Sequence, residues 1–578
     1  MRKLIKIFLV IFILIIGGYL YLKFGLLKAK DFKPNESKAI TPIDLRPSII
    51  AKLQQLVKDG SNGLYRLDIG KLNPDVVAST VDISDATLTP DSAVLKQLDK
   101  TKLAPDDVFK IKVHGIHIDG FGIEDLLHTN KVDVNSIHIT DPVIEVYHKL
   151  KPYNEAERKK NDSLSVYHRI MKQMKKISIG SIVIEHGKLI DHDLGHRNST
   201  KRFEDVAISI KDILIDSSTQ NDNNRFLFAK IADFACNDYA LVTPDSSYDF
   251  KIERIIISGE KHSLIAEGVS IKPHGGKEHF EKKLTYRKEM YSASFPKIVL
   301  TGTDWWSLLH RDKFIAERAD IDKGSFLIYL DNTPPSSPTI NVANFPDQLM
   351  MAISRPVSVS KVYLKNVKLT YEEFEPKINQ HGFAYFDNVE AVASNLTNMP
   401  QKIKLNKNAE LAGTAQFMNK VKFTAKINFD LTKSRQGAFF AYVHMDSLDK
   451  TVLNPITEPM ALFTFKSGTL KEGTATVTGD NMNAKGDVLV LYNNLNLTPL
   501  KQSKNDEGKL RKKVFTNFIA NALLIKNNNP TGNQQARHPV FVTNRDHHGN
   551  FFNFIWTTIL TGILKTVGIP VKLVVKEG

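Results

Sequence analysis

The chain has 578 residues, a formal charge of +15 and a single cysteine, Cys236. This length admits three or four ordinary domains, or one elongated repeat architecture. One cysteine excludes an internal disulfide framework, and a lone cysteine is most often a small core residue. Because the basic residues are spread along the chain without interleaved aromatics, the composition argues against nucleic-acid binding and favours a general affinity for anionic lipid surfaces.

Residues 1–30 predict a membrane anchor. Three basic residues precede an apolar run from Ile7 to Leu22, which continues past Lys23 to Leu27. The run reaches the ~17 to 25 residues of a transmembrane helix if Lys23 snorkels to the interface. A cleaved secretory signal is the alternative, although the run lacks a small-residue cleavage site at its end. We expect an inner-membrane, single-pass protein with the bulk of the chain in the periplasm; the anchor residues are Ile7, Phe8, Leu9, Ile11, Ile13, Leu14, Ile15 and Leu20.

A linker and an amphipathic helix are expected at 31–62. Apolar residues fall at helical spacing between Pro47 and Lys58, and Asp59-Gly60 is a stop signal. From 63 to 505 the period changes to two, as in half-buried strands. This alternation is clear at 64–69, 111–114, 132–134, 177–179 and 206–210. The body is therefore predicted to be mostly β, an elongated, curled, antiparallel sheet that forms a repeating, taco-like β-groove.

A weak internal repeat organises these strands. Its copies start about 45 residues apart twice, and each reads as strand, turn, strand. A unit of this kind cannot bury its apolar face alone and must stack on the next. The four copies are Ile137, Ile139, Pro142, Ile144 and Tyr147; Ile182, Ile184, Gly187, Leu189 and His192; Ala319, Ile321, Gly324, Phe326 and Tyr329; and Val362, Leu364, Val367 and Leu369, with Tyr371 one place early.

Three segments interrupt the pattern: the charged stretch from Tyr153 to Met174, expected as an insertion at the sheet's edge, and the polar or proline-rich 333–338 and 527–530. A helical closing segment is expected at 506–578. Its first helix would place Val514, Phe518, Ala522 and Ile525 on one face. The second has apolar residues at i, i+3, i+4, i+7 and i+8, and it lies in a membrane interface or plugs an apolar surface of its own chain. Its predicted apolar face comprises Phe552, Ile555, Trp556, Ile559, Leu560, Ile563, Leu564 and Val567, opposite Asn553, Thr557, Thr558, Thr561 and Lys565.

Catalytic chemistry finds little support in the sequence. His114 and His117 are expected on opposite sides of one strand, where they cannot share a metal. Asp191, His192, Asp193 and His196 could form a metal site, but their context favours a solvated turn. Because common nucleophile, phosphate-binding and metal motifs are absent, we expect no enzyme activity, no catalytic residue, no cofactor and no metal.

The alternating strands favour a trough with one apolar face, suited to acyl chains. Inward residues would hold the chains while lipid headgroups stay at the open edge. The alternative is that the same side chains fill a closed core. The lipid-groove candidates are Ile182, Ile184, Leu189, Ile208, Ile210, Val362 and Leu364.

Several patterns resemble the AsmA-like proteins of Gram-negative envelopes (AsmA/TamB type). They are the helix before Leu64-Tyr65-Arg66-Leu67, the repeat copies at 179–193 and 359–373, and the segment Leu453-Asn454-Pro455 with Glu458-Pro459. Gly468, Gly473, Gly479 and Gly486 before Tyr492-Asn493-Asn494-Leu495, and the closing Phe554-Ile555-Trp556, complete the set. The stretch from about Lys230 to Lys313 departs most from the pattern.

The resemblance implies an inner-membrane anchor, a periplasmic β-groove and a role in outer-membrane lipid homeostasis by phospholipid transfer. The expected partners are phospholipid, the inner membrane and an outer-membrane protein, with no nucleic acid. A second hypothesis is a non-enzymatic envelope scaffold or outer-membrane assembly factor that binds protein partners by strand addition. A third, a membrane-tethered hydrolase, would require a pocket with convergent polar groups.

Overall fold

The computed structural model describes residues 46–571 apart from 76, 121–130, 155–175, 196–198, 220–221, 223–224, 226–227, 244, 312, 339–344, 377, 450–451, 503–509 and 513–524. The chain divides into two compact units. Unit 1 is Met1–Leu241, Ile252–Ile265 and Leu309–Arg311; unit 2 is Val242–Lys251, Ala266–Leu308 and Asp312–Gly578. The boundaries between the two units fall within residues 230–313, the stretch that departs most from the pattern described above. They therefore divide the body that was predicted at 63–505.

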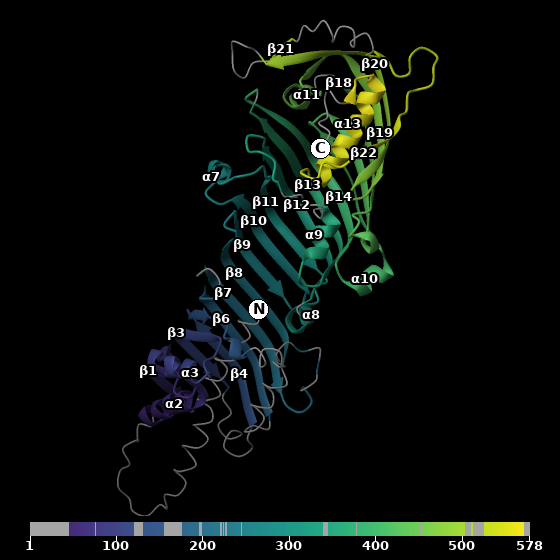
Figure 1. Ribbon diagram of the computed structural model, residues 1–578. Helices are drawn as coiled ribbons and strands as arrows, with labels where there is room; N and C mark the ends of the chain where they lie inside the picture. The colour runs from purple at the N-terminus through teal and green to yellow at the C-terminus, as the bar shows by residue number, and fades with distance from the viewer. Residues whose placement is uncertain are drawn as a thin grey trace, which may run out of the picture. The chain divides into compact units, whose positions relative to one another are not determined.

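Unit 1 is built on long strands with two helices (Figure 1). Alternate burial is clear in β5, where Ile144 and Val146 are buried between half-buried neighbours. Its elements are α2 (Arg46–Gly60), β1 (Tyr65–Asp75), β2 (Thr80–Pro90), α3 (Ser92–Lys100), β3 (Asp107–Asp119), β4 (Lys131–Thr140), β5 (Val143–His148), η2 (Pro152–Asn154), β6 (Lys176–Asp193), β7 (Ser199–Ile215) and β8 (Ala229–Val242). Strands β9 (Tyr248–Ser258) and β10 (Ser263–Pro273) contribute residues to both units.

Unit 2 is also a β structure, with short helices at the strand ends. From β11 to β17 each strand pairs with the next in chain order, and β17 and β18 both pair with β19. Strand β20 then joins β19, β21 and β22. Its strands are β11 (Met290–Thr301), β12 (Phe314–Asp331), β13 (Val357–Glu375), β14 (Gln380–Thr397), β15 (Asn408–Phe417), β16 (Val421–Asp430), β17 (Phe439–Met445), β18 (Leu448–Asp449), β19 (Phe463–Gly479), β20 (Asn483–Gln502), β21 (Leu510–Lys512) and β22 (Val540–Asn544). The helices are α7 (Lys277–Lys282), α8 (Trp305–His310), α9 (Pro346–Ala352), α10 (Pro400–Leu405), η3 (Leu431–Lys433), α11 (Asn454–Ala461) and α13 (Phe551–Val567).

The prediction of a mostly β body is confirmed, but the purely antiparallel arrangement is wrong. Strands β4 and β5 both pair in parallel with β6, and β12 pairs in parallel with β13. Parallel neighbours need a long crossover, whereas antiparallel neighbours need only a short turn. The crossovers are the segments 149–175 and 332–356, which contain the stretch predicted as an insertion, Tyr153 to Met174, and the proline-rich interruption at 333–338. A mixed sheet follows in each unit.

The parallel ladders place repeat copies beside each other in phase. Ile137 pairs with Ile182 and Ile144 with Leu189, each at the same position of its copy. In unit 2, Ala319 pairs with Val362 and Phe326 with Leu369. The stacking predicted for a real repeat is therefore present within each unit. Tyr371, one place early in the sequence alignment, pairs with Ile328.

Each of the four copies contains a residue with positive φ at the same position. These residues are Asp141 (51°), His186 (53°), Lys323 (63°) and Asn366 (53°). In β6 and β13 the register against the following strand shifts at this point, which marks a β-bulge. Because a bulge adds one residue, the apolar positions before and after it stay on one face of the sheet.

Helix α2 confirms the predicted amphipathic helix, and its Ile50 and Val57 pack on the core of unit 1. That core includes Ile137, Ile139 and Ile177, each 0% exposed. The predicted anchor at 1–30 and the helix around Val514 to Ala522 lie outside the described residues. Among the described helices, none is both long and apolar enough to cross a membrane.

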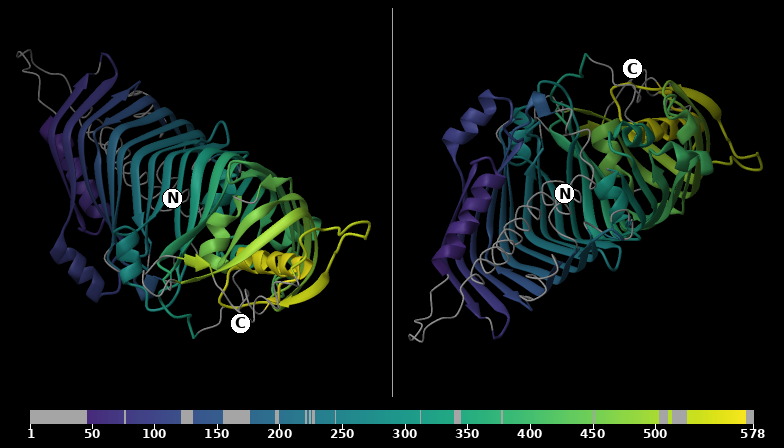
Figure 2. Two further views of the ribbon diagram at one scale, coloured as in Figure 1. Left: turned by 90° about the horizontal axis from the view of Figure 1, so that it is seen from above. Right: turned by 90° about the horizontal axis from the view of Figure 1, so that it is seen from below.

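Helix α13 lies against strands β19, β20 and β22 of its own unit (Figure 2). Of the two alternatives for this helix, the structure shows the one in which it covers an apolar surface of the chain. Its predicted inner face is partly wrong, since Phe552 is 52% exposed and Trp556 39%, whereas Thr558 is fully buried. Phe551 and Phe554 point inward instead, because they fill an aromatic cluster with Phe345, Phe429 and Phe439.

Candidate functional site

The seven predicted groove residues lie on three strands. Ile182, Ile184 and Leu189 are on β6, Ile208 and Ile210 on β7, and Val362 and Leu364 on β13. The first five belong to unit 1 and the last two to unit 2. The structure therefore forms two separate groups from this set.

The group in unit 1 is covered. Ile182 is 1% exposed and pairs across the ladder with Ile210, while Ile184 pairs with Ile208. Ile182, Ile184, Leu189 and Ile210 are buried members of the unit 1 core, and Ile208 packs against it half-buried. Their assignment to a lipid groove stays a prediction.

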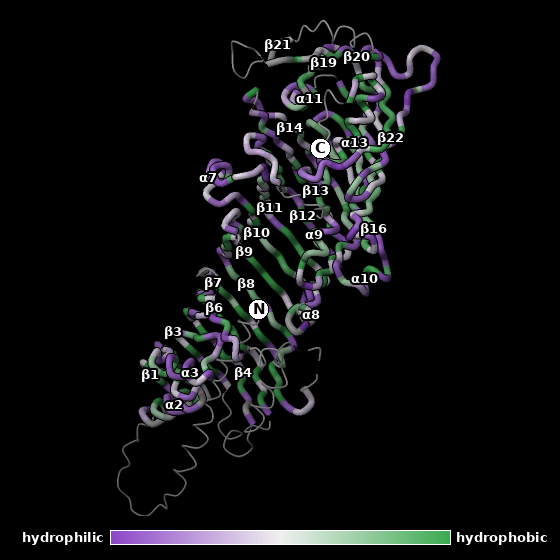
Figure 3. Tube along the Cα trace, in the orientation of Figure 1, coloured by the Kyte–Doolittle hydropathy of each residue, from purple (hydrophilic) through white to green (hydrophobic). Residues whose placement is uncertain are grey.

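The group in unit 2 is half-buried. Leu364 packs with Val367 and Ile321 in a small apolar cluster on β12, β13 and β14. Val362 lies in the cross-strand row Ala319, Val362, Ala393 and Leu411. Figure 3 shows hydrophobic stretches on these strands between the hydrophilic turns.

The same cross-strand row leads to the surface that α13 covers. Leu411, at the end of the row, packs against the cluster that contains Phe551 and Phe554 of α13. Val362 and Leu364 are thus on the face of the sheet that bears α13, but they keep partial solvent exposure. We call the half-buried part of this face over β12–β14 the open apolar face; it comprises Ile321, Val362, Leu364, Ala391 and Ala393.

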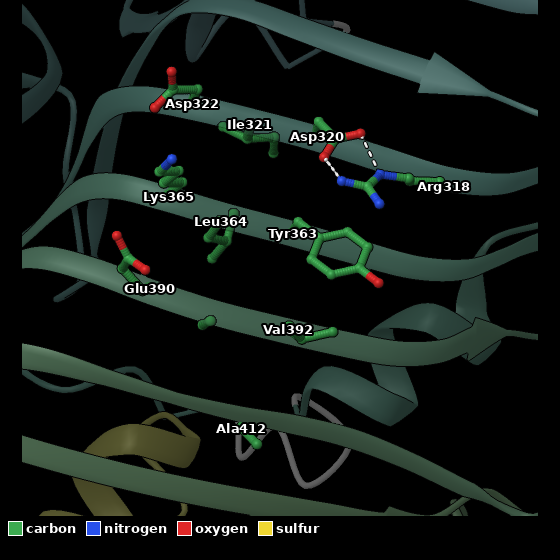
Figure 4. A pocket seen from close by; sticks show the side chains of 11 residues that line it. Arg318, Asp320, Ile321, Asp322, Tyr363, Leu364, Lys365, Glu390, Val392 and Ala412 are labelled. Carbon is green, nitrogen blue, oxygen red and sulfur yellow. Dashed lines mark hydrogen bonds and ion pairs between the residues drawn. The ribbon is translucent and has the colours of Figure 1, made fainter.

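The opposite face of these strands is charged. A cross-strand row of Asp320, Tyr363, Val392 and Ala412 alternates along the strands with the apolar row of Ile321, Leu364, Ala391 and Gly413. A shallow cavity of about 360 Å³ lies over the row that contains Asp320, and Ile321, Leu364 and Ala391 of the neighbouring row also line it (Figure 4). The small side chain of Ala412 leaves room at one end of the row.

Arg318 forms one wall of this cavity. Its Nε and Nη2 donate to the two oxygens of Asp320, both at 2.6 Å, and its guanidinium lies 4.1 Å from the centroid of the Tyr363 ring. The hydrogen bonds from this guanidinium to Asp320 raise the pKa of Arg318. Lys365, Asp322 and Glu390 form the rest of the charged surface. Sequence reasoning missed this cavity, although the alternation Arg318, Asp320, Asp322 was a usable signal.

The other side chains weighed for chemistry are paired with carboxylates or buried. His114 and His117 are both exposed, and each contacts its own aspartate on β2, Asp85 at 3.2 Å and Asp82 at 2.7 Å. Their expected placement on opposite sides is wrong, because the ladder skips Asp85 and His114. Burial raises the pKa of Cys236 to about 12, which suits the predicted core residue.

The region of Asp191, His192 and Asp193 was expected to be a turn and is the end of strand β6. The His192 ring stacks on Tyr147 and its Nδ1 lies 3.2 Å from Thr200 Oγ1. His196 lies outside the described residues. In the part of the chain that the structure describes, no group of three histidine, cysteine or acidic residues is arranged to hold a metal ion.

Comparison with known proteins gives no assignment. No protein-family model matches the chain, and no curated protein matches it. Among solved structures, the crystal structure of "Sex pheromone staph-cAM373 precursor" aligns over 62% of this chain and 96% of its own, with 9% identity and a TM-score of 0.12. A similarity this low carries no argument about fold or function.

Proposed function

We propose that this chain is an AsmA-like, membrane-anchored protein of the periplasm that binds phospholipid along an apolar face and conducts it between inner and outer membrane. The support is the open apolar face, where Val362 and Leu364 stay half-exposed beside a region of the same face that α13 covers. Each methylene of an acyl chain gains about 0.8 kcal/mol when it leaves water for such a surface.

The open apolar face of β12–β14 suits the acyl chains of a phospholipid, and the edge of the sheet suits its headgroup. Acyl chains pack on the open apolar face, and headgroups remain at the edge of the sheet, in water. The elongated, taco-like groove and the anchor at 1–30 belong to this proposal. Non-enzymatic action follows from the same reading, since transport needs a surface rather than a reacting group.

The test is a pair of charge substitutions on opposite faces of the same strands. Val362→Asp with Leu364→Asp places two carboxylates on the open apolar face, while Val392→Asp places one on the charged face. In the full-length protein we expect the first pair to abolish phospholipid transfer between vesicles and to remove copurified phospholipid, as measured by mass spectrometry. The Val392 variant should retain both. Unimpaired transfer by a folded Val362/Leu364 variant would reject the proposal.

A second candidate function is a scaffold that binds protein partners by strand addition. The observation that favours it is strand β22, which in the described residues pairs only with β20. Its Val540 and Val542 are 55% and 66% exposed, unlike the charged residues that usually protect an edge strand. Pull-down of the full chain and its Val542→Lys variant would separate the two: a scaffold loses its protein partner, whereas a lipid carrier keeps its lipid.

A further inference from the structure

Two short helices of unit 2, α9 and α10, carry exposed apolar side chains. Leu349 is 56% exposed, Ile353 43% and Leu405 84%. Single exposed apolar residues are ordinary on protein surfaces, but Leu349 of α9, Ile353 directly after α9 and Leu405 of α10 together form a patch. We call this surface the α9–α10 patch; it comprises Leu349, Ile353, Arg355, Lys402, Lys404, Leu405 and Lys407.

The chain just after α9 is held against the chain just before α10. The side-chain amide of Asn398, just before α10, donates to the carbonyl oxygens of Ile353 and Arg355, both at 2.9 Å, and its Oδ1 accepts from the Val357 amide at 2.7 Å. Met351 of α9 and Ile403 of α10 both pack inward on the cluster beneath α13. The outward side chains therefore lie on a supported surface rather than on a loose loop.

The patch is basic, and the one acidic residue of its two helices, Asp347 of α9, is buried. No aspartate or glutamate occurs between Gln348 and Tyr371 or between Ala391 and Ala409. Lys402 and Lys404 flank Ile403 and are exposed, and no ion pair of either is found among the described residues. Lys407 lies 3.9 Å from Asp430 at the edge of the patch. Exposed apolar side chains next to lysines are suited to the surface of an anionic lipid bilayer.

We propose that the α9–α10 patch docks on an anionic phospholipid membrane. Leu349, Ile353 and Leu405 enter the boundary between headgroups and acyl chains, and the lysines contact lipid phosphates. A protein partner fits this surface less well, because interface cores are enriched in aromatic residues and depleted of lysine. The docking does not depend on lipid transfer, so the patch and the open apolar face can fail separately.

The experiment places a reporter at the tip of the patch. Leu405→Cys is introduced in the full-length protein, labelled with an environment-sensitive nitrobenzoxadiazole dye and reconstituted in neutral-lipid nanodiscs. Cys236 is 1% exposed and its raised pKa makes it unreactive, so the dye reacts at position 405. Vesicles of phosphatidylcholine, alone or mixed with phosphatidylglycerol, are then added. We expect blue-shifted emission only with phosphatidylglycerol, and no shift for the same dye at Val542→Cys.

Charge reversal gives the matched comparison. Lys402→Glu with Lys404→Glu should weaken vesicle binding by at least about 25-fold, roughly fivefold for each lysine removed. Lys420→Glu with Lys422→Glu makes the same charge change in the turn after β15 and at the start of β16, and it should leave binding within about twofold. Equal binding to neutral vesicles, an unshifted dye at position 405, or equal losses in both double variants would overturn the proposal.

Discussion

The ring of Tyr147 stacks on the imidazole of His192, with centroids 4.7 Å apart and planes inclined by 11°. These residues hold the same position in successive copies of the repeat, and the parallel ladder of β5 and β6 makes them neighbours. Tyr147 also donates to Glu145, which raises the pKa of the tyrosine to about 12. A spacing of 45 residues in the sequence is thus a spacing of one strand in the sheet.

Gly324 should resist substitution where Gly473 does not. Gly324 has φ +135°, a conformation that other residues rarely adopt, and an added Cβ would lie 2.7 Å from the carbonyl oxygen of Ser294. We expect Gly324→Ala to lower the free energy of unfolding of unit 2 by about 2 kcal/mol or more. A Cβ added at Gly473 would have no atom within 4 Å, so Gly473→Ala should be neutral or slightly stabilising. Urea unfolding of both variants is the measurement, and equal effects would contradict the strain argument.

Phe551 should matter far more than its neighbour Phe552. Phe551 is 1% exposed, and its ring centroid lies within about 5 Å of those of Phe345, Phe429 and Phe439. Truncation of a buried phenylalanine costs about 3 to 5 kcal/mol, because the removed ring leaves a cavity. Phe551→Ala should therefore destabilise unit 2 by that amount, whereas Phe552→Ala should change its stability by less than about 1 kcal/mol. The reverse order in thermal or urea unfolding would restore the face predicted from the sequence.

Hydrogen bonds from Arg537 should hold the loop after residue 525 against the C-terminal end of α13. Its guanidinium donates to the Thr566 carbonyl at 2.9 Å, to Tyr492 Oη at 3.0 Å and to the Asn528 carbonyl. Arg537→Ala removes all three hydrogen bonds, leaving the Thr566 carbonyl only a long contact from Tyr492 Oη and the Asn528 carbonyl only that from Thr531 Oγ1, and should cost about 2 to 4 kcal/mol. Tyr492→Phe removes one acceptor of that set and should cost about 1 kcal/mol. Hydrogen exchange at the C-terminal end of α13 checks both variants, and unchanged protection in Arg537→Ala would refute the tie.

Asp347 should make unit 2 less stable as the pH rises through about 6. Burial raises its pKa from 3.8 to about 6, although amide hydrogen bonds in α9 act against the rise. The folded protein then binds more protons than the unfolded chain between these values, so the free energy of unfolding falls as the pH rises across this window. The loss, complete above the folded-state pKa, amounts to about 3 kcal/mol at most.

The Asp347→Asn variant carries no titrating group at this position. It should therefore be more stable than the parent above pH 6 and lack the decline between about pH 4 and 6. Urea unfolding across this pH range is the measurement. Parallel stability curves for the two proteins would show that the carboxyl is not responsible.

Alternation and repeat spacing correctly predicted a mostly β body with adjacent repeat copies. They did not predict which neighbouring strands are parallel. The segments around Ile69, Val113 and Ile179 are strands, because a period of two is read locally. Whether Ile137 stands next to Ile182 in parallel depends on a crossover through 149–175, and no local pattern marks such a connection. The positive φ of Asp141, His186, Lys323 and Asn366 is visible only once the copies are aligned with the backbone.

Of the candidate site, alternation predicted which residues share a face, whereas their role in binding lipid stays a prediction. Val362 and Leu364 were chosen from alternation, and the ladders place both on one face of the sheet. How much of that face stays exposed depends on α13, a helix about 190 residues farther along the chain. The burial of Phe551 depends on three aromatic rings from other parts of the chain. The sequence of the helix alone therefore does not predict which of Phe551 and Phe552 is buried.

Copies that lie in phase also set a rule for how such a chain changes length. Equivalent positions such as Ala319 and Val362 are adjacent. Duplication of one whole repeat copy would therefore add strands whose apolar face continues that of their neighbours. Insertion of a fraction of a unit would instead rotate every later residue to the wrong side or break the ladder. Addition of complete repeat copies is the change in length that this sheet accepts at the lowest energetic cost. The length of the sheet can thus change in steps of one copy, without repacking of its interior.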